Sequence, residues 1–185
     1  MLNYLYILLI LVILYGYTVV RYIDVLPTFP MFYPSNTEES HKVFHYMKNR
    51  TSKQVNLFYE TDETVSTAFA KIIPETKDDL DNIIFNYNSI ILFLKYLLNR
   101  ARPAQINRDV KSKLLISHSA ATPAYPSGHS FQAFILACKM SEKYPEKKKQ
   151  LFALAEDCGY ARIIAGLHYP SDHEFSKRLV KMLCF

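Results

Sequence analysis

From residue 37 to the end of the chain, apolar residues recur at the three- and four-residue intervals of an α-helix. Clusters of Val, Ile and Tyr that alternate as in strands are scarce, and no internal repeat is present. Prolines and polar residues divide the pattern into segments, because proline interrupts a helix interior. The sequence therefore predicts an all-α fold. The expected helices span residues 37–49, 63–73, 76–101, 127–143, 147–164 and 171–183.

Residues 2–20 contain no charged side chain, and Tyr residues lie toward both ends of this segment. Nineteen helical residues rise about 28 Å, the thickness of one hydrocarbon core. We expect a single-pass N-terminal membrane anchor. A cleaved signal peptide and a buried helix of a soluble protein are the alternatives, although the segment lacks a Lys/Arg n-region and an A-x-A-like cleavage site. Residues 21–36 include three prolines and are expected to link the anchor to a helical domain over residues 37–185.

The composition narrows the function classes. The 185 residues suffice for one domain, or for one domain with an appendage, and a chain that is 50% hydrophobic is neither disordered nor collagen-like. A net charge of +5 suits an anionic ligand or a membrane surface, whereas no nucleic-acid-binding motif is present. Three distant cysteines fit neither a disulfide framework nor a zinc site. We expect buried free thiols, with one bridged pair as the alternative. No sequence feature predicts an oligomeric state.

Two basic residues, Lys95 and Arg102, lie seven positions apart in an otherwise apolar segment. Seven residues return to within about 20° of the same helix stripe, so both side chains would point one way. Pro103 would end the helix after Arg102. Two cations with one direction indicate an anion between them. The alternative is that both snorkel from a surface helix into solvent.

The segment from Pro126 to Ser130 resembles a helix start, with Ser127 as the N-cap. The free N–H groups of a helix N-terminus bind anions, and Gly128 would permit close approach of an oxyanion. His129 would then lie in the first turn, beside the bound group. A capped helix with an incidental histidine is the alternative.

A third segment combines Arg162, His168 and Asp172. Pro170 is suited to a helix start, so Asp172 would lie in the first turn and face back toward His168. A carboxylate on one imidazole nitrogen sets the tautomer and leaves the other nitrogen as a nucleophile. Arg162 would add a planar, bidentate cation. The alternative is a helix-capping aspartate beside an unrelated histidine.

Together these segments resemble the three signature motifs of the type 2 phosphatidic acid phosphatase (PAP2) superfamily, in order and in spacing. The superfamily includes bacterial class A acid phosphatases, lipid phosphate phosphatases and vanadium haloperoxidases. The resemblance covers residues 95–172 and implies a compact helical bundle with the site between helix ends. It departs from the usual motifs at two positions: Ala161 stands where a Ser is usual, and His173 stands where an apolar residue is usual.

The resemblance also implies a metal-independent phosphatase that uses no cofactor and hydrolyses phosphate monoesters of small molecules or lipids through a phosphohistidine. Two alternatives are a vanadate-dependent haloperoxidase and an anion-binding module with a decayed site. The implied roles are nucleophile for His168, orientation of that ring for Asp172, proton donation to the leaving group for His129, and phosphate binding for Lys95, Arg102, Arg162, Ser127 and the backbone of Gly128.

Overall fold

A computed structural model describes residues 7, 30–117 and 119–184 of the chain. The expected anchor over residues 2–20, apart from Ile7, and the expected linker before Pro30 lie outside the described residues. None of the described helices combines the length and the apolar character that crossing a membrane requires. Membrane anchoring by residues 2–20 therefore stays a prediction from the sequence.

Residues 30–117 and 119–184 form helices and no strand, which confirms the expected all-α fold. Five of the six predicted helices are present with ends within a few residues of those expected. The elements are η1 (Pro30–Phe32), α2 (Asn36–Lys48), α3 (Ser52–Glu60), α4 (Ser66–Phe69), α5 (Lys77–Leu98), α6 (Pro103–Ile106), α7 (Arg108–Lys113), α8 (Gly128–Lys143), η2 (Pro145–Lys147), α9 (Lys148–Ile164) and α10 (Pro170–Cys184).

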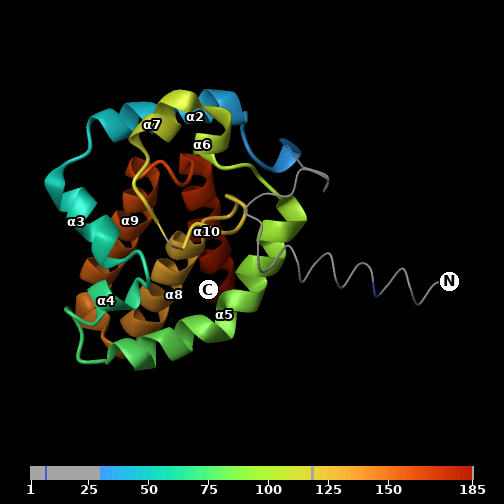
Figure 1. The fold of residues 1–185 in the computed structure, drawn as a ribbon. Helices are drawn as coiled ribbons and strands as arrows, with labels where there is room; N and C mark the ends of the chain where they lie inside the picture. Colours follow the sequence, from blue (N-terminus) through green and yellow to red (C-terminus); the bar gives the residue numbers. More distant parts are fainter. Residues whose placement is uncertain (1–6, 8–29, 118, 185) are drawn as a thin grey trace.

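Helix α8 forms the centre of the fold. It packs against α9, α10 and α5, and nine of its sixteen residues are buried. A helix that is apolar on most of its faces belongs in the core, which explains this position. In Figure 1, α8, α9 and α10 lie together, α5 runs along one edge of this group, and α2, α6 and α7 lie across one end.

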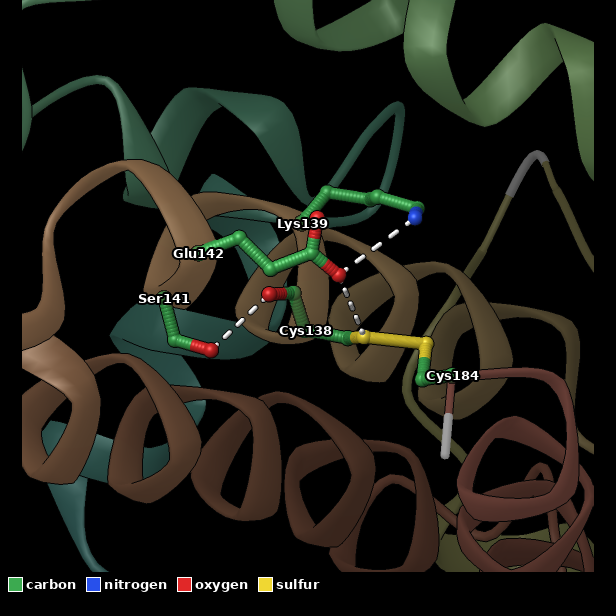
Figure 2. Close-up of a disulfide and its surroundings, with 5 residues drawn as sticks. All are labelled: Cys138, Lys139, Ser141, Glu142 and Cys184. Atoms are coloured by element: carbon green, nitrogen blue, oxygen red, sulfur yellow. Dashed lines mark hydrogen bonds and ion pairs between the residues drawn. A yellow bond between two sulfur atoms is a disulfide. The ribbon is translucent and has the colours of Figure 1, made fainter.

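Helices α8 and α10 begin together and run in the same direction. The amide of Ser127 donates to the carbonyl of Asp172 at 3.1 Å, next to the first turn of each helix. Eleven and twelve residues further on, Cys138 and Cys184 form a disulfide (Figure 2). Equal numbers of residues rise equally along two parallel helices, so the two ends meet. The expectation of free thiols is wrong for this pair and correct for Cys158, which is buried and unbonded.

Helix α5 begins as predicted but ends earlier. A capping box at its start joins Thr76 and Asp79: the Asp79 amide donates to the Thr76 hydroxyl at 3.2 Å, and the Thr76 amide donates to the Asp79 carboxylate at 3.3 Å. The helix ends at Leu98 because Asn99 adopts a left-handed backbone with a φ of 42°. The prediction that the helix extends to residue 101 is therefore wrong.

The helix predicted over residues 63–73 is reduced to the four residues of α4. The hydroxyl of Thr64 accepts the Ser66 amide and donates to the Asp81 carboxylate at 2.6 Å. Such side-chain bonds offer the backbone an alternative to the helical ladder, which delays the start of the helix. The short helices α3, α6 and α7 were not predicted from the sequence. Of these, α3 begins at a capping box between Thr51 and Gln54.

Candidate active site

A cavity of about 210 Å³ opens where the C-terminal part of α5, the N-terminus of α8 and the turn between α9 and α10 meet. Six of the eight predicted site residues line it. Ser127 and Asp172 are buried and do not line the cavity. The hydroxyl of Ser127 accepts a hydrogen bond from that of Ser130, and the carboxylate of Asp172 contacts the ring of His168. The six predicted lining residues are Lys95, Arg102, Gly128, His129, Arg162 and His168.

The ring of His168 is held at both nitrogens. Its Nδ1 lies 3.1 Å from Oδ2 of Asp172, and its Nε2 lies 3.1 Å from Nη1 of Arg102. A guanidinium can only donate, so Nε2 is the acceptor and carries a lone pair. The proton is therefore on Nδ1 and points to the carboxylate. Burial, followed by the charges of Arg102 and Lys95, lowers the pKa of His168 well below its ordinary value, which favours this neutral form.

Backbone carbonyls fix Arg102 in this position. Its Nε and Nη2 donate to the carbonyl of Thr122 at 3.0 and 2.8 Å, and its Nη1 donates to the carbonyl of Leu167 at 2.9 Å. Arg102 lies three residues beyond the left-handed residue Asn99 and is not part of α5. The prediction that Arg102 shares a helix stripe with Lys95 is therefore wrong, although both residues reach the same cavity.

Lys95 is buried in the wall of the cavity. Its Nζ donates to the carbonyl of Pro123 at 2.7 Å, and a Cβ on Gly128 would lie 3.5 Å from its Cε. The N-terminus of α8 and the ammonium group therefore lie side by side. Burial, followed by the neighbouring charge of Arg102, lowers the pKa of Lys95 well below its ordinary value. An anion in the cavity would oppose this shift because it favours the charged form.

Arg162 offers donors that the described protein does not use. The side chain is only 1% exposed, and its Nη2 donates to Oδ1 of Asp62 at 2.8 Å and to the hydroxyl groups of Ser117 and Ser119. Its Nε and Nη1 have no hydrogen-bond partner among the described residues. Buried donors are almost always paired, so these two point to a ligand that accepts hydrogen bonds.

His129 lies in the first turn of α8 and is half-buried. Its Nε2 lies 3.1 Å from the backbone carbonyl of Asp62, which can only accept, so the neutral ring carries its proton on Nε2. Burial, followed by the charge of Arg162, lowers the pKa of His129 well below its ordinary value, while the Asp62 carbonyl and carboxylate oppose the shift.

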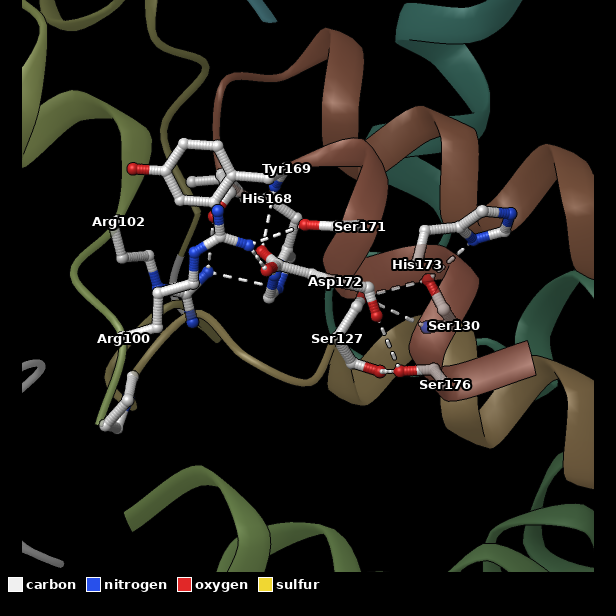
Figure 3. Close-up of polar contacts among 12 residues, drawn as sticks. Arg100, Arg102, Ser127, Ser130, His168, Tyr169, Ser171, Asp172, His173 and Ser176 are labelled. Carbon is white, nitrogen blue, oxygen red and sulfur yellow. Dashed lines mark hydrogen bonds and ion pairs between the residues drawn. The ribbon is translucent and has the colours of Figure 1, made fainter. Parts of the chain in front are cut away.

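The structure adds a buried arginine that was not predicted from the sequence. Arg100 donates from Nη1 to Oδ1 of Asp172 at 2.6 Å (Figure 3). It also donates from Nη2 to Oε2 of Glu39 at 2.8 Å. Its guanidinium also lies 3.8 Å from the ring centre of Tyr169. Asp172 thus lies between Arg100 and His168, and α2 contributes to the support of the site through Glu39.

Comparison with known proteins now identifies the family. The family model of the PAP2 superfamily matches residues 81–177, just over half of the 185-residue chain. The chain belongs to the PAP2 superfamily. It is 31% identical over 114 residues to a non-specific acid phosphatase of Salmonella typhimurium and 30% identical over 114 residues to one of Salmonella typhi. Each match covers 55% of this chain and 42% of the relative, so the chain spans less than half of these curated relatives.

The structure also accounts for the two departures from the usual PAP2 motifs. Ala161 packs in an apolar cluster with Phe58 and does not line the cavity. His173 is buried, with Nε2 2.8 Å from Glu156 and Nδ1 3.0 Å from the Ser130 hydroxyl. Ser130 in turn donates to the hydroxyl of Ser127 at 2.9 Å. In this PAP2 protein, His173 is therefore a hydrogen-bonded core residue behind the N-terminus of α8.

Proposed function

We propose that this chain is a metal-independent phosphatase that hydrolyses phosphate monoesters through a phosphohistidine at His168. One observation carries the proposal: the two unpartnered donors of Arg162 and the lone pair of His168 Nε2 belong to residues that line the same cavity. A phosphate there satisfies the donors and presents phosphorus to the nitrogen. The names of the two curated relatives, both non-specific acid phosphatases, support the same class of reaction.

Three cations and the N-terminus of α8 would bind the phosphate oxygens. Lys95, Arg102 and Arg162 line the cavity and are each at most 7% exposed, so their charges are shielded from bulk solvent. In the structure, Arg102 donates a hydrogen bond to the lone pair of His168 Nε2. A phosphate oxygen would compete for this donor and release the lone pair for attack. The same groups then stabilise the charge on the equatorial oxygens in the transition state.

The reaction proceeds in two displacements. Nε2 of His168 attacks phosphorus, the bond to the leaving oxygen breaks, and the imidazolium of His129 protonates that oxygen. Water then attacks the phosphohistidine, gives its proton to His129, and displaces Nε2 as inorganic phosphate forms. Asp172 accepts a hydrogen bond from the Nδ1–H group throughout and stabilises the positive charge that His168 carries in the intermediate.

This mechanism requires a neutral His168 and a charged His129 at the same time. Burial and the surrounding cations lower the pKa values of both rings below the ordinary histidine value. The fraction of His129 that is protonated grows as the pH falls. The rate as a function of pH is therefore bell-shaped, with its maximum on the acid side of neutral.

Hydrolysis of p-nitrophenyl phosphate by the full chain tests the proposal. We expect turnover in excess EDTA, and a loss of about a thousandfold or more in kcat for His168→Ala. Brief incubation with a labelled phosphomonoester should leave acid-labile, base-stable label on the wild type and none on the variant. His41→Ala, at an exposed position of α2, is the matched control and should retain full activity.

Two results would contradict the proposal. Loss of activity in EDTA with recovery on adding Mg²⁺ or Zn²⁺ would exclude a metal-independent reaction. Substantial turnover by His168→Ala would remove His168 from the nucleophilic role.

A comparison of a small aryl phosphate with a lipid phosphate in mixed micelles decides the substrate class. Fractionation of cells that express the full chain tests the proposed membrane association of residues 2–20.

A further inference from the structure

One part of the cavity lining has a different chemistry from the part that carries the three cations. The lining there consists of two amides, two apolar side chains and one carboxylate, contributed by α5, α8 and the loop before α4. These residues are Asn88, Gln132, Ile91, Leu92 and Glu63. None of them belongs to the phosphate-binding groups described above, so this part of the cavity is available to the leaving group of the substrate.

Helix geometry places the two amides about one to two turns away from the reacting groups. Asn88 precedes Lys95 by seven residues, and so lies on the same face of α5 about 10 Å along its axis. Gln132 follows His129 by three residues and shares its face of α8. The two helices meet at this level, because Nε2 of Gln132 donates to Oδ1 of Asn88 at 3.1 Å.

The amide pair retains hydrogen-bonding capacity toward the cavity. Both side chains are only partly buried, and they make no other hydrogen bond within the described residues. Nδ2 of Asn88 can therefore donate, and Oε1 of Gln132 can accept. A donor and an acceptor held side by side suit a ligand with neighbouring hydroxyl groups. Ile91 is buried and Leu92 half-buried on the same wall, which offers an apolar surface for the carbon skeleton.

We propose that Asn88 and Gln132 form a leaving-group subsite that selects neutral, hydroxyl-bearing leaving groups such as those of sugar and polyol monophosphates. This inference rests on the proposed phosphatase function and specifies its substrate class. Glu63, an exposed carboxylate that lines the same cavity, disfavours leaving groups that carry a second phosphate, because like charges repel.

A matched pair of substrates tests the subsite. Glucose 6-phosphate and hexyl phosphate both carry a primary phosphate on six carbons and differ in the hydroxyl groups. We expect a higher kcat/KM for the sugar phosphate in the wild type. Asn88→Ala and Gln132→Met should each lower that value about tenfold, while kcat/KM for hexyl phosphate changes less than about twofold. Glu63→Gln should raise kcat/KM for fructose 1,6-bisphosphate relative to the monophosphate.

Asn86→Ala is the matched control, because Asn86 lies on an exposed part of α5 and does not line the cavity. Thermal unfolding of each variant reports whether it is folded. Equal losses on both substrates, or no loss on either, would overturn the subsite. A wild type that hydrolyses hexyl phosphate but not the sugar phosphate would overturn the subsite and leave the phosphatase function standing. A wild type that hydrolyses no phosphomonoester would overturn both.

Discussion

The guanidinium of Arg100 lies 2.6 Å from the carboxylate of Asp172, and neither side chain is exposed to solvent. The carboxylate also accepts the amide of Tyr169 at 2.8 Å and the ring N–H of His168. Arg100 is itself paired with Glu39. The orientation of His168 therefore depends on a buried chain of alternating charges that extends from α2 to α10.

Arg100→Met should destabilise the protein by about 3–5 kcal/mol, because it leaves two carboxylates buried without their partner. Burial already raises the pKa of Asp172 against the opposing charge of Arg100, so removing that charge raises this pKa further. The carboxylate that orients His168 would then be partly protonated, and kcat should fall. Urea unfolding and p-nitrophenyl phosphate turnover measure the two effects.

Arg108→Met is the control for this change, since Arg108 is exposed at the start of α7. It should alter the free energy of unfolding by less than about 0.5 kcal/mol. Arg100→Lys keeps the charge but loses the guanidinium fork that reaches both carboxylates. Its free energy of unfolding should lie between those of Arg100→Met and Arg108→Met. If Arg100→Met were as stable and as active as Arg108→Met, the buried chain of charges would have no role in the site.

Asp62→Asn should move the alkaline limb of the kcat/KM profile to lower pH. The Asp62 carboxylate raises the pKa of His129, whereas Arg162 lowers it. Without the carboxylate, the charge of Arg162 is no longer offset, so the pKa of His129 falls. Since His129 must be protonated to donate its proton, the enzyme is then active only at lower pH. The profile in p-nitrophenyl phosphate hydrolysis measures the shift, and NMR titration of His129 reports it directly.

Asp157→Asn provides the comparison, because Asp157 is exposed on α9, the helix that carries Arg162. Its profile should match that of the wild type. An alkaline limb that stays in place in Asp62→Asn, or moves to higher pH, would show that His129 is not the group that titrates there.

Gly159→Ala should destabilise the fold by about 1–3 kcal/mol through overpacking. A Cβ at this position would lie 2.1 Å from Nδ1 of His173 and 2.7 Å from Oγ of Ser130, both of which are buried. Truncation of the ring in Gly159→Ala/His173→Ala removes the nearer of these contacts. The double variant should therefore be less destabilised than the sum of the single variants, as measured by urea unfolding. Strict additivity would mean that the ring does not limit the space at Gly159.

Reduction of the Cys138–Cys184 disulfide should lower the free energy of unfolding by about 2–4 kcal/mol, because the bond closes a loop between residues 46 positions apart. Dithiothreitol should lower the Tm of the wild type and leave unchanged the Tm of a variant with Ser at both positions.

Burial raises the pKa of the Cys158 thiol to about 12, so iodoacetamide should not modify it in the folded protein at pH 8. Alkylation of Cys158 in the folded protein, detected by mass spectrometry, would contradict this prediction.

Signals that act within a few residues determined much of this protein. Proline positions and the N-cap at Ser127 predicted where α8 and α10 begin, and the spacing of His168 and Asp172 predicted their hydrogen bond, which the structure contains. These predictions succeeded because capping and first-turn contacts depend only on local backbone geometry. The end of α5 was missed because the left-handed cap at Asn99 has no glycine to mark it.

Only the tertiary structure decided which distant charges meet. Arg100 and Glu39 are 61 positions apart, and Arg162 and Asp62 are 100 positions apart, so no sequence spacing relates them. The pairing of Cys138 with Cys184 likewise depends on α8 and α10 running in parallel. The chain can encode which residues bear charge, but burial in a packed core determines which opposite charge must satisfy each of them, because a buried charge without a partner is too costly to retain.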